Sequence, residues 1–91
     1  MKEPEPLYDV FEEDDKVLVV AEIPSADVQD IGIIAAPMTL KISVKGKSRH
    51  IKLPCLISPS SGQAEFRNGV LEVHLKKTSK REKEASLIII N

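Results

Sequence analysis

A two-residue Asn-Gly pair between two strand-like segments is the feature that most constrains the fold of this chain. Asn68 and Gly69 tolerate the positive φ angles that a tight turn needs, which makes this pair the strongest short-range signal for a β-hairpin. After the pair, apolar residues supply the strand, and every second residue from Glu72 is polar and falls on the opposite face. The sequence therefore predicts a hairpin over residues 64–75.

The rest of the chain shows the two-residue alternation of strands and no long helical period. We expect further strands at 7–12, 16–23, 31–36, 38–45 and 49–54. Strand 16–23 is apolar on both faces and is expected to be buried on both sides. Strand 38–45 alternates most regularly, with inward positions at Met38, Leu40, Ile42 and Val44. The pattern predicts an all-β fold, an immunoglobulin-like β-sandwich of about seven strands.

The length of 91 residues fits one domain, in which oligomerisation would add to a thin stability margin. We expect a short N-terminal arm at 1–6, the domain at 7–77, and a C-terminal linker with an apolar tail at 78–91. The linker is polar and charged, whereas the segment 58–62 has the composition of a flexible loop.

Composition excludes several classes of function. Thirteen basic and fourteen acidic residues nearly cancel, which argues against a nucleic-acid-binding protein. No apolar run approaches the ~20 residues of a membrane span, and the N-terminus lacks the core of a signal peptide, so we expect a cytoplasmic protein. Cys55 is the single cysteine and is expected to be a buried structural thiol. We find no catalytic set, metal site or cofactor motif and expect no enzyme.

Short motifs follow one another in a specific order along residues 8–75. They are Asp9-Val10-Phe11-Glu12, Ala21-Glu22-Ile23-Pro24 with Asp30-Ile31, Met38-Thr39-Leu40-Lys41-Ile42, Arg49 before Leu53-Pro54, and Ala64, Phe66 and Asn68-Gly69-Val70-Leu71. The ordered set resembles the α-crystallin domain of the small heat-shock proteins. That resemblance implies a chaperone that holds unfolding proteins without ATP and needs no cofactor.

The chain departs from that family's pattern in its loop and in its arm. Many members carry a long loop whose extra strand swaps into a partner subunit, whereas here only Gly46, Lys47 and Ser48 join the two strands. Three residues at about 3.3–3.6 Å each cannot reach another subunit, so a swapped dimer is excluded. Dimerisation along the edge strand 49–53, with Arg49 and Ile51 at the edge, remains open. The short arm argues against a large assembly.

The resemblance also implies a role for the tail. Ile88-Ile89-Ile90 is similar to the family's Ile-x-Ile motif, which docks into an apolar groove of a neighbouring subunit. Ile88 and Ile90 are the expected pair, although Leu87 with Ile89 is also consistent with the sequence. The receiving groove is expected between strands 31–35 and 63–67, at Ile31, Ile33, Ala64 and Phe66. Docking onto a second subunit is favoured, and packing of the tail onto its own sheet is the alternative.

The leading prediction is a holdase whose partners are other copies of the chain and unfolding client proteins. The alternative is an adaptor similar to the CS-domain co-chaperones, which would bind a specific ATPase partner. A structural module of a larger protein is the third possibility.

Overall fold

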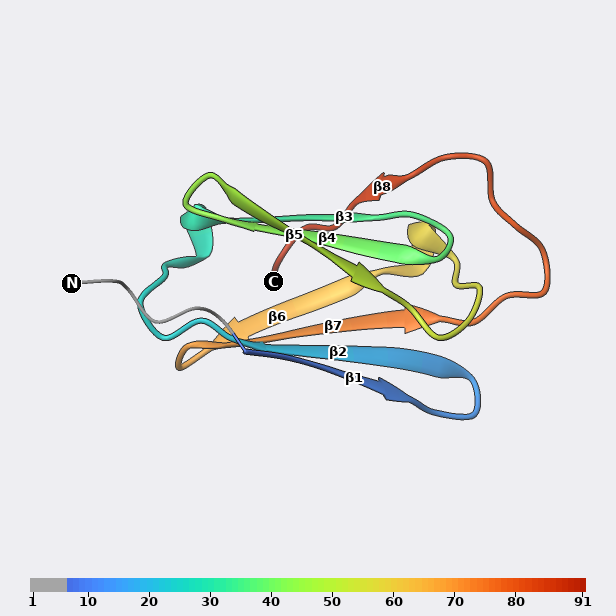
Figure 1. The fold of residues 1–91 in the computed structure, drawn as a ribbon, viewed down its shortest axis with the longest axis horizontal. Helices are drawn as coiled ribbons and strands as arrows, with labels where there is room; N and C mark the ends of the chain where they lie inside the picture. Colours follow the sequence, from blue (N-terminus) through green and yellow to red (C-terminus); the bar gives the residue numbers. More distant parts are fainter. Residues whose placement is uncertain (1–6) are drawn as a thin grey trace.

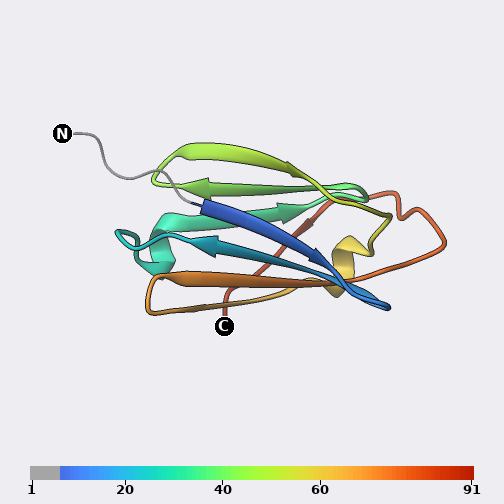
Figure 2. The same cartoon turned by 60° about the horizontal axis from the view of Figure 1, so that its bottom comes forward.

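The computed structural model describes residues 7–91, which form two four-stranded antiparallel sheets packed face to face (Figures 1 and 2). The first sheet has the order β1-β2-β7-β6, with bounds Leu7–Glu12, Lys16–Glu22, Val70–Lys76 and Gln63–Arg67. The second has the order β5-β4-β3-β8, with bounds Lys47–Lys52, Thr39–Val44, Ile31–Ala35 and Ser86–Leu87. Two 3₁₀ turns, η1 (Val28–Asp30) and η2 (Pro59–Ser61), complete the fold. The predicted all-β sandwich is confirmed.

The core lies between the sheets and is built from every second residue of the inner strands. Its fully buried members include Val17, Val19, Ile33, Leu40, Ile42, Leu71 and Val73. The second face of β2 is different, because Leu18 and Val20 are only half-buried there. The prediction that this strand is buried on both sides is therefore wrong, since no second layer of residues 7–91 packs against its outer face.

Two-residue turns with positive φ angles close the β4-β5 and β6-β7 hairpins. Asn68 and Gly69 have φ angles of 50° and 79° and join β6 to β7, as the sequence predicts. Lys45 and Gly46 have φ angles of 50° and 82° and join β4 to β5. The predicted three-residue connection at 46–48 is thus wrong, because the turn uses Lys45 and β5 already begins at Lys47.

One further prediction about the strands is corrected by the structure. Met38 is 42% exposed rather than inward-pointing, because the chain turns here (the Ala36 N–H donates to the Thr39 carbonyl at 2.9 Å) and β4 begins only at Thr39. The described residues form eight strands, in agreement with the prediction of about seven, and the last is the short Ser86–Leu87 strand of the tail, which pairs with β3. The predicted arm at 1–6 lies outside the described residues.

No helix within residues 7–91 has the length and apolar character needed to cross a membrane.

Candidate functional site: the groove between β3 and β6

The C-terminal tail lies across one open side of the sandwich, between the two sheets (Figure 1). It first runs antiparallel to β3, where Ser86 and Leu87 pair with Ala35 and Ile34. It then reaches β6 of the other sheet, where Ile90 forms a parallel bridge with Ala64. The groove between β3 and β6 is therefore occupied by the tail of the same chain.

Main-chain hydrogen bonds fix the direction of the tail in this groove. The Ile88 N–H donates to the Ile33 carbonyl at 2.9 Å, and the Asn91 N–H donates to the Ala64 carbonyl at 2.9 Å. One bond goes to each sheet, so the tail bridges them. A segment bound in this way is recognised through its backbone, as in the addition of a strand to a sheet edge.

Side chains of the tail alternate between the groove and the solvent. Ile88 is 5% exposed and belongs to the core, and Ile90 is half-buried against it. Leu87 and Ile89 are 68% and 73% exposed. The pair that faces the groove is therefore Ile88 with Ile90, in an extended segment whose alternate residues point the same way.

Gly62, which lies between η2 and β6, makes room for the side chain of Ile88. A Cβ placed on Gly62 would lie 2.4 Å from Ile88 Cδ1 and 2.7 Å from Ile88 Cγ1. It would also lie 3.3 Å from Leu75 Cδ2. Ile88 thus fits into a notch that exists only because residue 62 has no side chain, so this glycine shapes the groove.

The four predicted groove residues occupy β3 and β6 as expected from their positions in the chain. Ile33 and Ala64 are fully buried and are the two residues whose carbonyls hold the tail. Ile31 and Phe66 are half-buried and pack against the core from the same two strands. The sequence favoured docking onto a second subunit, whereas in this single chain the tail packs onto its own sheets, which is the alternative it left open.

The linker before the tail is held to the body of the domain at its root. The Ser58 N–H donates to the Lys76 carbonyl at 2.8 Å, and the Thr78 N–H donates to the Leu56 carbonyl at 3.2 Å. The Lys77 ammonium lies 2.8 Å from a Glu12 carboxylate oxygen, a hydrogen bond that raises the pKa of Lys77. The linker therefore leaves the domain from a fixed point.

A second attachment lies further along the linker, at Glu82. Its carboxylate accepts hydrogen bonds from the hydroxyls of Ser58 and Ser60, the latter at 3.1 Å, and from the Ser60 N–H at 3.4 Å. We call these three residues the Glu82 clamp. They join the linker to η2, the same short turn that ends at the Gly62 notch.

The Glu82 clamp predicts a measurable titration. Hydrogen bonds from Ser58 and Ser60 stabilise the carboxylate and hold the pKa of Glu82 below its ordinary value of 4.5. Because the clamped pKa is depressed, the clamp is at full strength above that ordinary value and weakens as the pH falls through the clamped pKa. We expect carboxyl-carbon NMR to give a midpoint below 4.5 for Glu82. The Ser58→Ala/Ser60→Ala variant should move it upward, and an unchanged midpoint would contradict the clamp.

The opposite side of the sandwich lies between the edges of β1 and β5. Arg49 of β5 is exposed and stacks over the Tyr8 ring of β1, with its guanidinium carbon 5.2 Å from the ring centroid. Burial raises the pKa of the Tyr8 hydroxyl more than the Arg49 charge lowers it. Arg49 and Ile51 lie on the same face of β5, but Ile51 is 8% exposed and belongs to the core, whereas Arg49 is exposed at the rim between the sheets. Exposed basic or imidazole side chains line this edge, at Lys47, Arg49, His50 and Lys52.

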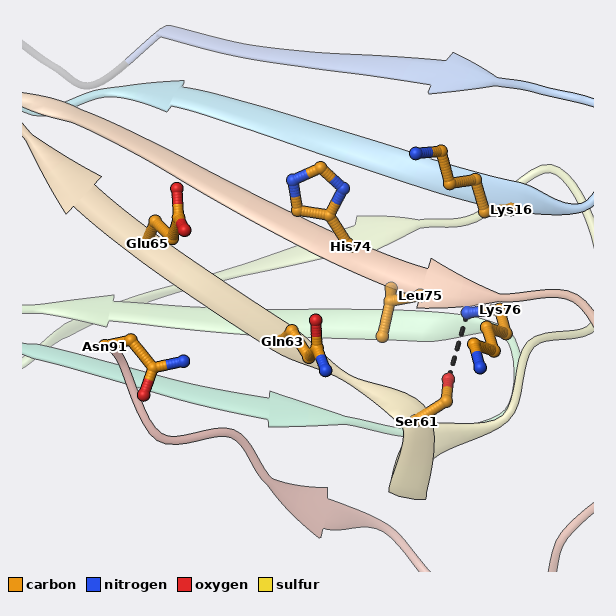
Figure 3. Close-up of a pocket in the computed structure, with 8 residues that line it drawn as sticks. All are labelled: Lys16, Ser61, Gln63, Glu65, His74, Leu75, Lys76 and Asn91. Atoms are coloured by element: carbon orange, nitrogen blue, oxygen red, sulfur yellow. Dashed lines mark hydrogen bonds between the residues drawn. The ribbon is translucent and has the colours of Figure 1, made fainter.

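A polar hollow of about 310 Å³ lies on the outer face of the first sheet (Figure 3). Its lining residues are Lys16, Ser61, Gln63, Glu65, His74, Leu75, Lys76 and Asn91. The Ser61 hydroxyl donates to the Ser58 carbonyl at 2.6 Å and accepts from the Lys76 N–H at 2.9 Å. Its proton is therefore not directed at His74, and the hollow holds no activated nucleophile.

Several residues of the site gave no recognisable signal in the sequence. Gly62 and its neighbours were interpreted as a flexible loop, yet Pro59 is buried at the start of η2, a position that proline favours and that could have indicated a turn. Glu82 lies among similar charges and has no local signal. Cys55 is half-buried rather than fully buried. No group of three or more His, Cys, Asp or Glu side chains within residues 7–91 is arranged to hold a metal ion.

Comparisons with known proteins agree with this architecture. The sequence profile of the GerT C-terminal domain family matches residues 10–75. Heat shock protein 16.0 from Schizosaccharomyces pombe is similar at 28% identity and a TM-score of 0.74, over 87% of this chain and 71% of that chain. No curated protein matches the sequence significantly.

Two further solved structures share the fold at lower identity. A small heat-shock protein from Xylella fastidiosa is 20% identical with a TM-score of 0.66, over 88% of this chain and 93% of that chain. A mutant of hsp14.1 from Sulfolobus solfatataricus P2 is 20% identical with a TM-score of 0.67, over 87% of this chain and 76% of that chain. Together these likenesses show that the sandwich has the fold of the small heat-shock proteins. By the profile match over residues 10–75, the chain belongs to the GerT C-terminal domain family.

Proposed function

We propose that this chain is an ATP-independent holdase that binds extended apolar segments of unfolding proteins in the groove between β3 and β6. The observation that supports this most is the tail itself. An extended segment with Ile88 and Ile90 two residues apart fits the groove through backbone bonds to both sheets. An unfolding protein exposes many segments of this kind, with β-branched residues at alternate positions.

The tail must leave the groove before a client can enter. Burial of Ile88 stabilises the docked tail by roughly 1.5–3 kcal/mol. Ordering each backbone residue of the tail opposes docking by about 1–2 kcal/mol. Because the ordering cost applies to every tail residue whereas only Ile88 and Ile90 pack against the core, the docked tail belongs to the least stable part of the fold and opens without global unfolding. The tail therefore acts as a reversible competitor for the groove rather than as a permanent part of the core.

Because the tail competes with clients for the groove, it lowers the apparent affinity of the protein for them. A short linker keeps the tail at an effective concentration of about a millimolar near its groove. A tail that is docked about 90% of the time lowers the apparent affinity for a client about tenfold. Variants that weaken docking are therefore expected to hold clients better than the natural sequence does.

A turbidity assay with two matched tail variants tests this function. A heat-labile enzyme is warmed with each protein near equimolar subunits. We expect the natural chain to suppress aggregation, and the Ile88→Ser/Ile90→Ser variant to do so at a severalfold lower concentration. The Leu87→Ser/Ile89→Ser variant is the control, because those side chains are 68% and 73% exposed and should leave protection unchanged.

The same experiment separates the holdase from the adaptor. Equal protection by both variants would show that the groove is not the client site. No protection by any variant, with retention of one specific ATPase on the immobilised protein, would favour the adaptor instead. Light scattering of the same samples measures the subunit number on which client surfaces depend.

Self-association through β5 is part of the same proposal. Ile51 supports this edge from inside the core, and Lys47, Arg49 and Lys52 are exposed along the same strand. Pairing of two β5 strands would place basic side chains near one another, which is unfavourable. A dimer formed at this edge is therefore weak, which is consistent with a client surface that exchanges its occupants.

A further inference from the structure

Docking of the tail depends on how many linker residues are free to move between Thr78 and Ser86. The root of the linker is fixed at Thr78, whose N–H bonds to the Leu56 carbonyl at 3.2 Å. The tail enters the sheet at Ser86, the first residue of β8. With Glu82 held by Ser58 and Ser60, three residues (83–85) lie between the clamp and the sheet. Without the clamp, seven residues (79–85) lie between Thr78 and Ser86.

Loop length changes the probability that the tail finds its groove. The closing probability of a flexible segment falls with about the three-halves power of its length. Lengthening the mobile segment from three residues to seven therefore lowers the local concentration of the tail about threefold. The direction in which the linker leaves the clamp adds to this, because η2 ends beside the notch that receives Ile88.

We infer that the Glu82 clamp is a latch that sets how often the tail occupies the groove. Glu82 is half-buried among neighbours that are mostly exposed, and its carboxylate meets two hydroxyls and one amide of the same turn. Each of these partners donates to the carboxylate, which is the arrangement that makes hydrogen bonds to a charged group strong. The inference rests on the proposed function only for its consequence, which is access of clients to the groove. Control of tail docking by the latch does not depend on whether the protein binds clients.

Exchange of two tail amides reports the latch directly. The Ile88 and Asn91 N–H groups are the donors that hold the tail to Ile33 and Ala64. Hydrogen exchange followed by NMR at fixed pH measures how often these bonds open. We expect the Glu82→Ala variant to exchange both amides at least about threefold faster than the natural chain does. Amides of the core, such as that of Val73, should keep their natural rates.

The control is a carboxylate in the same linker that makes no contact recorded among residues 7–91. Glu84 is exposed and lies two residues further on, so the Glu84→Ala variant removes the same charge without touching η2. It should leave the exchange of Ile88 and Asn91 unchanged. A second route to the same state is the Ser58→Ala/Ser60→Ala variant, which removes the hydroxyl partners of Glu82. Combining it with Glu82→Ala should add little further acceleration.

The outcomes distinguish the latch from the holdase. Equal exchange in the Glu82→Ala and Glu84→Ala variants, or equal acceleration of tail and core amides, would overturn the latch. Additive effects of the two clamp variants would overturn it as well. Faster tail exchange supports the latch whatever happens to clients. If that faster exchange brings no gain in suppression of aggregation, the latch stands and the groove is not the client site.

Discussion

A single methyl group at residue 62 is expected to expel the tail from the groove. In the Gly62→Ala variant the new Cβ would lie 2.4 Å from Ile88 Cδ1 and 2.7 Å from Ile88 Cγ1. Overpacking of this kind costs about 1–3 kcal/mol. The contact involves a weakly held tail, so undocking is the cheapest relief. We expect fast exchange of the Ile88 amide, stronger client protection, and a loss of about 1–2 kcal/mol in the free energy of unfolding measured with urea.

Gly32→Ala is the matched control for this variant. Within the described part of the chain, a Cβ on Gly32 would meet Ser43 Cβ alone, at 3.9 Å, which is an ordinary contact, and the backbone there does not require glycine. We expect this variant to leave the tail and its exchange rates unchanged. Truncating the opposing side chain in the Gly62→Ala/Ile88→Ala variant removes both overlapping atoms. It should therefore be no less stable than Ile88→Ala alone. An Ile88 amide that stays protected in the Gly62→Ala variant would show that the notch does not decide docking.

Replacement by alanine is expected to lower the free energy of unfolding by different amounts at the two hairpin glycines, Gly69 and Gly46. Gly69 and Gly46 have similar φ angles of 79° and 82°, so replacement by alanine strains both backbones alike, by about 1–2 kcal/mol. A Cβ on Gly69 would also lie 3.0 Å from the Cα of Pro24, whereas no atom of residues 7–91 lies within 4 Å of a Cβ on Gly46. Because the contacting atom of Pro24 belongs to the main chain, it cannot move aside by a side-chain rotation. We therefore expect Gly69→Ala to lose about 1 kcal/mol more than Gly46→Ala does.

Urea unfolding of the two variants measures this difference directly. For a domain of this size, each kcal/mol also lowers the melting temperature by about 4–8 °C. Equal losses would mean that the approach of Pro24 to the hairpin adds nothing. The contact has a second element, since the Ile23 N–H donates to the Gly69 carbonyl at 2.7 Å. The turn between β6 and β7 is therefore fixed by the segment that follows β2, not only by its own two residues.

Signals that act over a few residues predicted most of the fold. The Asn68-Gly69 hairpin and the alternation of buried residues in β4 and β7 depend on neighbours in the chain, which the sequence displays. Met38 was misplaced by the same rule, because the turn at residues 36–39 delays the start of β4 to Thr39. The motifs of the α-crystallin domain then ordered the strands into a sandwich, which no local pattern specifies.

The arrangement at the groove was less accessible to prediction. The tail pair and the two receiving strands could be named from the family's motif. Docking within the chain depends on where the linker leaves the domain, which hydrogen bonds at Lys76 and Thr78 decide. Ser58 and Glu82 are 24 residues apart, and charge patterns carry no information about such a contact. Gly62 also gives no signal in the sequence, because its role is to leave space for Ile88, and only the folded structure brings these two residues together.

The basic side chains along β5 bear on how the proposed holdase would avoid aggregating together with the proteins it binds. Unpaired strand edges template the growth of fibrils, and a chaperone works where aggregating chains are most concentrated. One open flank of this sandwich is covered by residues 86–91, and the β5 edge carries Lys47, Arg49 and Lys52, whose mutual repulsion opposes stacking of like strands. The proposed holdase would thus offer a binding surface to unfolding polypeptides without seeding an amyloid of its own.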